Sequence, residues 1–324
     1  MIPALSTSDV ERLRPHANRP AAGFEPLEVF LEQEAMNSSG QSADCLTVLI
    51  RGSECSFRCL MCDLWKSTHA GKTPLGSIPA QLRIAFQRQR GVSGTDPNWI
   101  KLYNASNFFA PVNVPTEDLN EIASLVCDFD RVIVENHPRL TTSHIKQFAS
   151  RLNGRLEVAM GLETIHEGVL ESLNKGMDLS HFSDSCRQLR AWNVDIRVFV
   201  LLRPPGLDEN EGIEWCRKSI EFAFNLGARH VSIIPVRAGN GAIEYLQRHG
   251  VFEPPLVRSA EALLNEYLAD QRGVVTVDTW CWQHLRGQCE RCADARRLRI
   301  EKMNLQRERI ALPCLQCDCM TELV

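Results

Sequence analysis

Apolar runs alternate along the chain with segments of helical periodicity, and this alternation is the main structural signal. The apolar runs are hydrophobic at both parities, as expected of strands buried on both faces. The expected strands cover residues 46–50, 99–103, 132–135, 156–161, 196–202, 230–235 and 274–279, and the expected helices cover 81–89, 117–127, 143–152, 181–192, 210–226 and 256–269. Alternating strands and helices predict an α/β fold whose parallel strands are joined by right-handed crossovers.

The two ends of the chain depart from this alternation. Residues 1–44 are expected to form an amino-terminal extension with a short helical pattern over 27–34. Residues 45–280 contain all the expected strands and form the core domain. Residues 281–324 are rich in cysteine and are expected to form a metal-binding segment at the carboxyl terminus.

The composition is that of an ordinary globular protein and narrows the functional classes. Of the 324 residues, 44% are hydrophobic and 23% are charged. No apolar stretch reaches the length of about 18 residues that a membrane span needs. The amino terminus lacks a basic region followed by an apolar one, so we expect no export signal and a cytoplasmic location. The net charge of −4 argues against binding nucleic acid through overall charge, although a local basic patch stays open.

Three cysteines directly after the first expected strand carry the clearest chemical signal. Cys55, Cys59 and Cys62 have the spacing C-x3-C-x2-C. Three thiolates from one short loop can hold three irons of a [4Fe–4S] cluster and leave the fourth iron without a protein ligand. A disulfide framework is disfavoured, because the thirteen cysteines are an odd number in a chain without an export signal. A zinc site would need a fourth ligand, for which His69 is the only close substitute.

The triplet resembles the cluster loop of the radical S-adenosylmethionine (SAM) enzymes. In that superfamily the open iron binds the amino and carboxylate groups of SAM, and one electron from the cluster cleaves SAM to methionine and a 5′-deoxyadenosyl radical. Five further motifs resemble the archaeosine synthase radical SAM subunit group, itself similar to the radical SAM half of the Elongator catalytic subunit. They lie at residues 101–109, 132–136, 161–164 with 174–176, 202–205 and 286–292.

The resemblance implies a fold and a cofactor site. The implied fold is a partial (β/α)6 barrel, similar to a TIM barrel that closes only part-way, with a cysteine-rich carboxyl-terminal metal-binding cap. Functional residues of such barrels sit at the carboxyl ends of the strands. Asn104 and Ser106 occupy the turn that receives the SAM ammonium, although the acidic residue common in relatives is missing. Glu163 corresponds to the position for the SAM ribose or amino group, and Lys175 to the partner of the SAM carboxylate.

The residues alone also allow simpler interpretations of the SAM contacts. From composition alone, an ordinary polar turn is the favoured interpretation of the sequence around Asn104 and Ser106. A lysine before a glycine, such as Lys175, is often a cation placed at the end of a helix. At the cluster loop, Met61 stands where relatives usually have an aromatic residue, and its apolar bulk can still pack on the loop.

The carboxyl-terminal segment contains a second cysteine system. Its six cysteines follow the pattern C-x7-C-x2-C-x21-C-x2-C-x-C and are Cys281, Cys289, Cys292, Cys314, Cys317 and Cys319. Two thiolate pairs about twenty residues apart are a strong metal signal. Tetrahedral zinc on Cys289, Cys292, Cys317 and Cys319 fits the resemblance, with Cys314 as a substitute ligand. The same thiols could instead hold an auxiliary iron–sulfur cluster.

A basic segment lies between these two cysteine pairs. Residues 293–310 contain six cations, Arg296, Arg297, Arg299, Lys302, Arg307 and Arg309. The favoured interpretation is a solvated helix with pairs such as Glu301 near Arg297. The alternative is a surface that contacts phosphates of a nucleic acid.

The predicted function is reductive cleavage of SAM at a [4Fe–4S] cluster. By resemblance, the substrate is a tRNA base or its adduct, bound directly or delivered by a partner, and the electron donor is a protein such as flavodoxin or ferredoxin. Two alternatives stay open. One is radical modification of a small metabolite, and the other is a non-catalytic iron–sulfur or zinc protein that acts as a sensor or scaffold.

Overall fold

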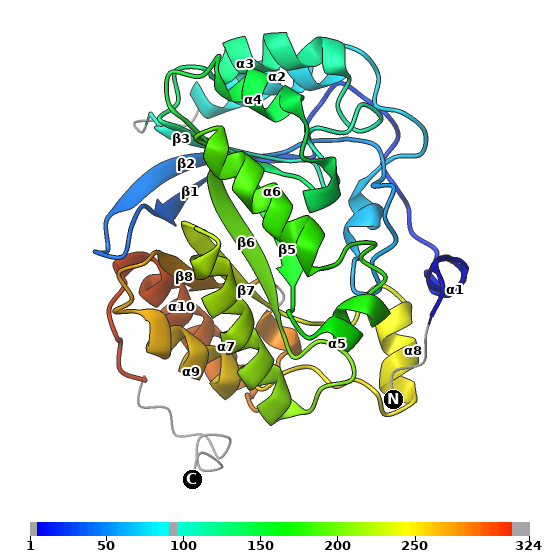
Figure 1. The fold of residues 1–324 in the computed structure, drawn as a ribbon, viewed down its shortest axis with the longest axis vertical. Helices are drawn as coiled ribbons and strands as arrows, with labels where there is room; N and C mark the ends of the chain where they lie inside the picture. The colour runs from blue at the N-terminus through cyan, green and yellow to red at the C-terminus, as the bar shows by residue number, and fades with distance from the viewer. Residues whose placement is uncertain (1–4, 91–95, 281, 313–324) are drawn as a thin grey trace.

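A single eight-stranded sheet organises the chain in the computed structural model, which describes residues 5–90, 96–280 and 282–312 (Figure 1). The strands pair in chain order; β1 is antiparallel to β2, and all later pairs are parallel. The strands are β1 (Glu28–Ala35), β2 (Ser42–Leu49), β3 (Trp99–Tyr103), β4 (Arg131–Glu135), β5 (Arg155–Glu163), β6 (Asp195–Leu202), β7 (His230–Pro235) and β8 (Val274–Val277). All seven expected strands are present, as β2 to β8.

Helices connect the parallel strands and cover the outer face of the curled sheet (Figure 1). The helices are α1 (Thr7–Leu13), α2 (Ser77–Arg90), α3 (Leu119–Val126), α4 (Ser143–Ala149), α5 (Glu167–Ser172), α6 (Leu179–Ala191), α7 (Glu209–Asn225), α8 (Ala242–Arg248), α9 (Val257–Tyr267) and α10 (Glu290–Gln306). The main hydrophobic core lies between the sheet and these helices. Six strand–helix units precede β8, which confirms the predicted partial α/β barrel. No helix in the described part of the chain is long and apolar enough to cross a bilayer.

The helix expected over 27–34 is wrong, because this segment is strand β1. Its acidic residues explain the difference. Glu32 and Glu34 both pair with Lys101 of β3, and Glu34 also pairs with Arg197 of β6 at 2.9 Å. Both carboxylates therefore lie on the same face of an extended strand, in which side chains two residues apart point to the same side. Ion pairs with distant strands override the local pattern here, and a single sequence does not display them.

Helix α10 bridges the two edge strands of the sheet. It contacts both β1 and β8. The Asn304 side chain donates to the carbonyl of Val277 at 2.8 Å and accepts from the backbone N–H of Val277 at 3.0 Å. Arg307, just after the helix, donates to the carbonyls of Val275 and Tyr267. These contacts satisfy backbone groups along the open edge of β8, which otherwise would be available to pair with another strand.

The interpretation of the basic segment as a solvated helix is wrong for its most buried cations. Arg296 is fully buried and donates to both carboxylate oxygens of Glu261, at 3.0 and 2.6 Å. Arg299 is also buried and lies 3.2 Å from Glu261. Only the expected pair on the surface is confirmed, with Arg297 donating to Glu301 at 2.7 Å. A helix that closes the sheet needs an inward face, and here that face contains two arginines that share the carboxylate of Glu261 of α9.

Charged side chains fill the amino-terminal half of the sheet interior. Glu157 is fully buried and pairs with Arg197 at 2.6 Å, Arg131 at 2.8 Å and Arg229 at 2.7 Å. These arginines hold the pKa of Glu157 well below its ordinary value despite burial, which alone would raise it. Charge is thus compensated at the amino-terminal end of the sheet, and at the carboxyl end the side chains of Asn104 and Ser106 have no hydrogen-bond partner among the described residues.

Candidate cluster and cofactor site

The cysteine triplet lies in the loop that follows β2, at the carboxyl edge of the parallel strands. Its members, Cys55, Cys59 and Cys62, are all partly exposed. The loop begins beside the neighbouring strand, where the backbone N–H of Ile50 donates to the carbonyl of Tyr103 at 2.8 Å. The end of β2 thus delivers the thiols to the edge of the sheet where active sites of such folds are built.

Apolar packing and backbone hydrogen bonds hold the loop between its last two cysteines. Leu60 is fully buried, and its N–H donates to the carbonyl of Leu173 at 2.8 Å. The Asn240 amide donates to the carbonyls of Leu60, at 2.5 Å, and Cys62, at 3.4 Å. Met61 packs against the same hydrophobic cluster as Leu60, as its apolar bulk predicts.

Two N–H groups lie next to the sulfur of Cys55, where they can stabilise a metal-bound thiolate. The Asn107 amide donates to the Cys55 sulfur at 3.1 Å, and the Phe57 N–H lies 3.4 Å from the same atom. Burial raises the pKa of Cys59 to about 11 and that of Cys62 to about 12. Both side chains are therefore neutral thiols in the metal-free chain at pH 7, and a cation such as iron would displace their protons.

The arrangement of the triplet differs from that of a single-ion site. Within residues 5–90, 96–280 and 282–312, no three His, Cys, Asp or Glu side chains are grouped as one metal ion requires. Each thiolate of an iron–sulfur cluster binds a different iron, so cluster ligands need not meet at one point. The ring Nδ1 of His69 lies 2.9 Å from the carbonyl of Ala70 instead of joining the cysteines. Among the described residues, His69 therefore does not complete a four-ligand set with the three cysteines.

Two of the predicted cofactor residues form a buried ion pair. The Lys175 ammonium donates to a carboxylate oxygen of Glu163 at 2.5 Å, and both side chains are buried. Burial opposes the charged form of Lys175, but the carboxylate of Glu163 holds its pKa above the ordinary value. Gly161 lies directly beneath them, and a Cβ there would force both charged groups to shift. Lys175 is thus a fixed cation beside the cysteine loop.

Histidine 137 ties the cysteine loop to the turn that contains Lys175. Its Nε2 lies 3.0 Å from the carbonyl of Lys175, and its Nδ1 accepts from the N–H of Arg139 at 3.2 Å. Its ring stacks on Phe57, with ring centres 3.7 Å apart. Burial and the nearby Lys175 lower the pKa of His137 to about 3, so the ring is neutral and Nε2–H is the donor. The sequence analysis assigned no role to this residue.

The turn after β3 contains polar atoms without partners. Asn104 is completely buried, yet among the described residues neither its side-chain oxygen nor its nitrogen has a hydrogen-bond partner, and the Ser106 hydroxyl also lacks one. Ala105 between them has a φ of 53°, a left-handed conformation that is unfavourable for alanine. Buried polar atoms are normally satisfied, and strained residues cluster at ligand sites. Both observations fit a turn that receives a polar ligand.

Glu135, at the end of β4, supplies a carboxylate beside this turn. Its side chain accepts hydrogen bonds from the backbone N–H groups of Asn104 and Ala105. Burial raises the pKa of Glu135 to about 7, with these hydrogen bonds and Lys175 opposing the rise. The motif at 132–136 contained this residue, but nothing in one sequence indicates that the end of β4 meets the turn after β3. The turn itself has no acidic residue, but the carboxylate of Glu135 from the neighbouring strand lies beside it.

Glu163 sits in an unusual backbone conformation at the same edge. Its φ is 68°, and the pairing of β5 with β6 shifts register between Gly161 and Glu163. Asn174, before Lys175, also has a positive φ of 53°. These conformations turn both members of the ion pair out of the regular strand and helix geometry, at a cost of about 1–3 kcal/mol each.

The second cysteine system is only partly described. Cys289 and Cys292 lie together at the start of α10, with their sulfur atoms 3.7 Å apart. The remaining cysteines of the predicted site fall outside the described residues, namely Cys281, Cys314, Cys317 and Cys319. The described pair has the spacing of one half of a four-thiolate site.

The raised pKa of Glu135 predicts a pH-dependent cost to folding. Folded Glu135 keeps its proton to about pH 7, whereas its ordinary pKa is 4.5, so the folded state binds more protons between these values. The free energy of unfolding should therefore fall as the pH rises through this range. Relative to Glu135→Gln, wild type should lose up to about 3 kcal/mol between pH 4.5 and 8. Urea unfolding of the metal-free chain measures this difference, with Glu117→Gln, an exposed carboxylate, as the control. A difference that does not change with pH would contradict the prediction.

Comparison with known proteins finds relatives of the same group that the motifs resemble. No protein-family model matches the chain. An uncharacterized protein of Methanocaldococcus jannaschii is 22% identical over 313 residues, which cover 91% of this chain and 84% of that protein. Archaeosine synthase subunit beta of Methanosarcina acetivorans is 24% identical over 260 residues, covering 76% of this chain and 73% of the relative.

Solved structures give a more distant likeness. The Elp3 protein of Methanocaldococcus infernus matches 62% of this chain and 52% of its own with 14% identity and a TM-score of 0.49. The two sequence relatives named above cover 91% and 76% of this chain. The chain is thus similar to archaeosine synthase subunit beta, which confirms the resemblance that its motifs predict.

Proposed function

We propose that this chain is a radical SAM enzyme. The observation that carries the proposal is the set of groups that meet at one edge of the sheet: the cysteine triplet, the buried Glu163–Lys175 pair and the unpaired atoms of Asn104 and Ser106. Cys55, Cys59 and Cys62 hold the [4Fe–4S] cluster, which supplies the electron that cleaves SAM to methionine and a 5′-deoxyadenosyl radical.

The remaining residues bind and orient SAM in this proposal. Lys175 has its ammonium fixed by Glu163, so it can accept a carboxylate as a second partner without a search through rotamers. Asn104 and Ser106 offer oxygen acceptors and N–H or O–H donors to the amino-acid portion of SAM. Glu135 stands beside them as an acidic acceptor for an amino group. The contacts of Asn104 and Ser106 would satisfy buried side-chain atoms that have no hydrogen-bond partner among the described residues.

For the substrate, we propose a tRNA base or an adduct on one. The support is the similarity to archaeosine synthase subunit beta. Arg296 and Arg299 are buried and paired with Glu261, so phosphate contacts would have to come from exposed cations in or beside this segment, such as Arg291, Lys302 and Arg309. Alternatively, a partner delivers the tRNA. The alternative substrate is a small metabolite. The alternative to an enzyme is a non-catalytic iron–sulfur or zinc protein that acts as a sensor or scaffold.

Reductive SAM cleavage tests the proposal directly. After anaerobic reconstitution and reduction, wild type should form 5′-deoxyadenosine, and a variant with Cys55, Cys59 and Cys62 all changed to Ala should form none. The variant should also lack the brown colour of the cluster, because no thiolates are left to bind its irons. Undiminished 5′-deoxyadenosine from the triple variant would refute the assignment. A wild type that binds the cluster but never cleaves SAM would favour the sensor.

The SAM role of Lys175 predicts a loss of affinity. Lys175→Met should weaken SAM binding about 10- to 150-fold, corresponding to about 1.5–3 kcal/mol for a hydrogen bond to a charged group. Equilibrium dialysis of the reconstituted protein measures the affinity, with the exposed Lys146→Met as the control. The double variant Glu163→Gln/Lys175→Met removes the unpaired buried carboxylate and should recover stability but not affinity. Normal SAM binding with a lowered unfolding temperature in Lys175→Met would mean that the pair is only structural.

We propose that Cys289, Cys292, Cys317 and Cys319 hold a zinc ion, and the alternative is an auxiliary iron–sulfur cluster. Because this site is separate from the first triplet, metal analysis of the triple alanine variant should find about one zinc per chain, as a four-thiolate site requires. Cys289→Ala should lower stability, since structural metal binding is coupled to folding. Iron without zinc in the triple variant would decide for the auxiliary cluster.

A further inference from the structure

The amino-terminal segment crosses the cysteine loop, although its sequence indicated no role. The segment 5–23 contains α1, which lies beside α8 (Figure 1). Val10 of α1 is buried in the same hydrophobic cluster as Leu60 of the cysteine loop. The carbonyl of Leu13 approaches Gly241 so closely that a Cβ there would collide with it. The segment is therefore packed against the loop and its support.

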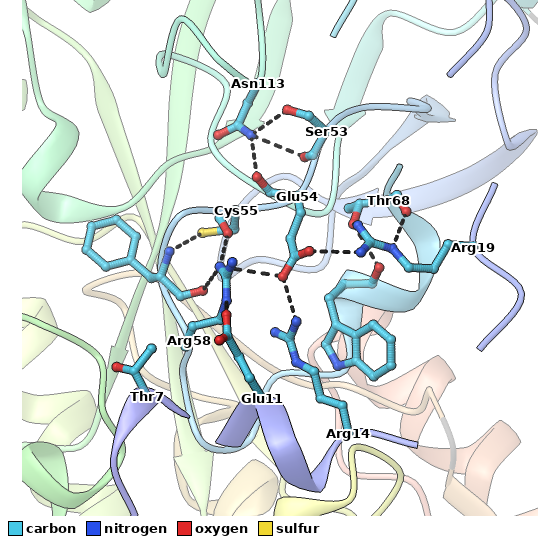
Figure 2. A network of polar contacts seen from close by, with 12 residues as sticks. Thr7, Glu11, Arg14, Arg19, Ser53, Glu54, Cys55, Arg58, Thr68 and Asn113 are labelled. Atoms are coloured by element: carbon cyan, nitrogen blue, oxygen red, sulfur yellow. Dashed lines mark hydrogen bonds and ion pairs between the residues drawn. The ribbon is translucent and has the colours of Figure 1, made fainter. Parts of the chain in front are cut away.

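A single carboxylate collects three arginines directly before the first cysteine. Glu54 lies 2.7 Å from Arg14, 3.0 Å from Arg19 and 3.4 Å from Arg58 (Figure 2). Arg14 and Arg19 come from the amino-terminal segment, and Arg58 comes from the loop itself. The side chain of Glu54 is only 16% exposed, so solvent screens these pairs less than it screens pairs on an open surface.

Each arginine also holds a second part of the loop region. Arg58 donates to the carbonyl of Cys55 at 2.5 Å, and Arg19 donates to the carbonyl of Thr68 at 2.8 Å and to its hydroxyl at 3.0 Å (Figure 2). Arg14 lies over the ring of Trp65, 4.7 Å from its centre. The network therefore connects the start of the cysteine loop with the segment that follows the last cysteine.

This network contains more positive than negative groups. Three guanidinium groups face the carboxylates of Glu54 and of Glu11, which lies 2.6 Å from Arg58. A net positive charge therefore lies next to Cys55. Reduction of an iron–sulfur cluster adds negative charge, and nearby charge and hydrogen bonds set its reduction potential. Cations at this position favour the reduced form.

We propose that residues 5–23 form a strap that positions the cluster ligands and raises the reduction potential of the cluster. Arg14 and Arg19 are its positioning residues, and Glu54 is their anchor on the loop. The inference rests on the proposed cluster at Cys55, Cys59 and Cys62. It assigns to the amino-terminal extension a part in the cofactor site.

The test compares full-length protein with the double variant Arg14→Gln/Arg19→Gln after anaerobic reconstitution. The variant should lose iron to a chelator about tenfold faster, the scale of one charge-assisted hydrogen bond. Its cluster should have a more negative midpoint potential in a redox titration followed by electron paramagnetic resonance. Arg12→Gln is the matched control, because Arg12 is on α1 but is exposed and pairs only with Asp9 among the described contacts. Equal potentials and equal rates of iron loss in wild type and double variant would overturn the proposal.

Glu54→Gln separates charge from packing. Removing this carboxylate also loosens the strap, so iron loss should again accelerate, but the midpoint potential should move in the positive direction because a negative charge is gone. A negative shift in both variants would overturn the electrostatic part. If wild type takes up no cluster, the proposed function itself fails. Hydrogen exchange in the metal-free chain then tests the strap alone: residues 51–69 should exchange faster in the double variant, and unchanged exchange would overturn the positioning role.

Discussion

Parallel pairing of the strands is the constraint on which the rest of the structure depends. It brings the carboxyl ends of β2 to β8 to one edge of the sheet, although the residues at those ends are far apart in the sequence. The cysteine loop follows β2, the Asn104 turn follows β3, Glu135 ends β4, and Glu163 ends β5. No local preference of these residues for one another is needed, because the sheet register places them.

The two ends of the sheet interior differ in how their polar side chains are paired. At the amino-terminal end, Glu157 is surrounded by arginines and every large charge has a partner. At the carboxyl end, Asn104 lacks partners, Glu135 has a raised pKa and Glu163 has a left-handed backbone. Unsatisfied buried groups and strain are costly, so their presence at this edge is typical of a site completed by a ligand.

The sequence predicts what depends on local pattern, and it fails where distant charges decide. Every parallel strand was predicted, because strands buried on both faces are apolar at both parities. The segment 27–34 was misassigned because Lys101 and Arg197 draw its carboxylates into the sheet interior. The buried state of Arg296 depends on Glu261, 35 residues earlier in the chain. The predicted cofactor residues lie together, but the parts played by Glu135 and the amino-terminal strap follow only from the fold.

The most direct measurement of the central claim is electron paramagnetic resonance of the reconstituted, reduced protein, recorded without and with SAM. We expect the signal of a reduced [4Fe–4S] cluster, and we expect its shape to change when SAM is added, because an iron without a protein ligand is open to SAM. A cluster signal that SAM leaves unchanged would contradict an open iron. A protein that gains no cluster would contradict the assignment of Cys55, Cys59 and Cys62 altogether.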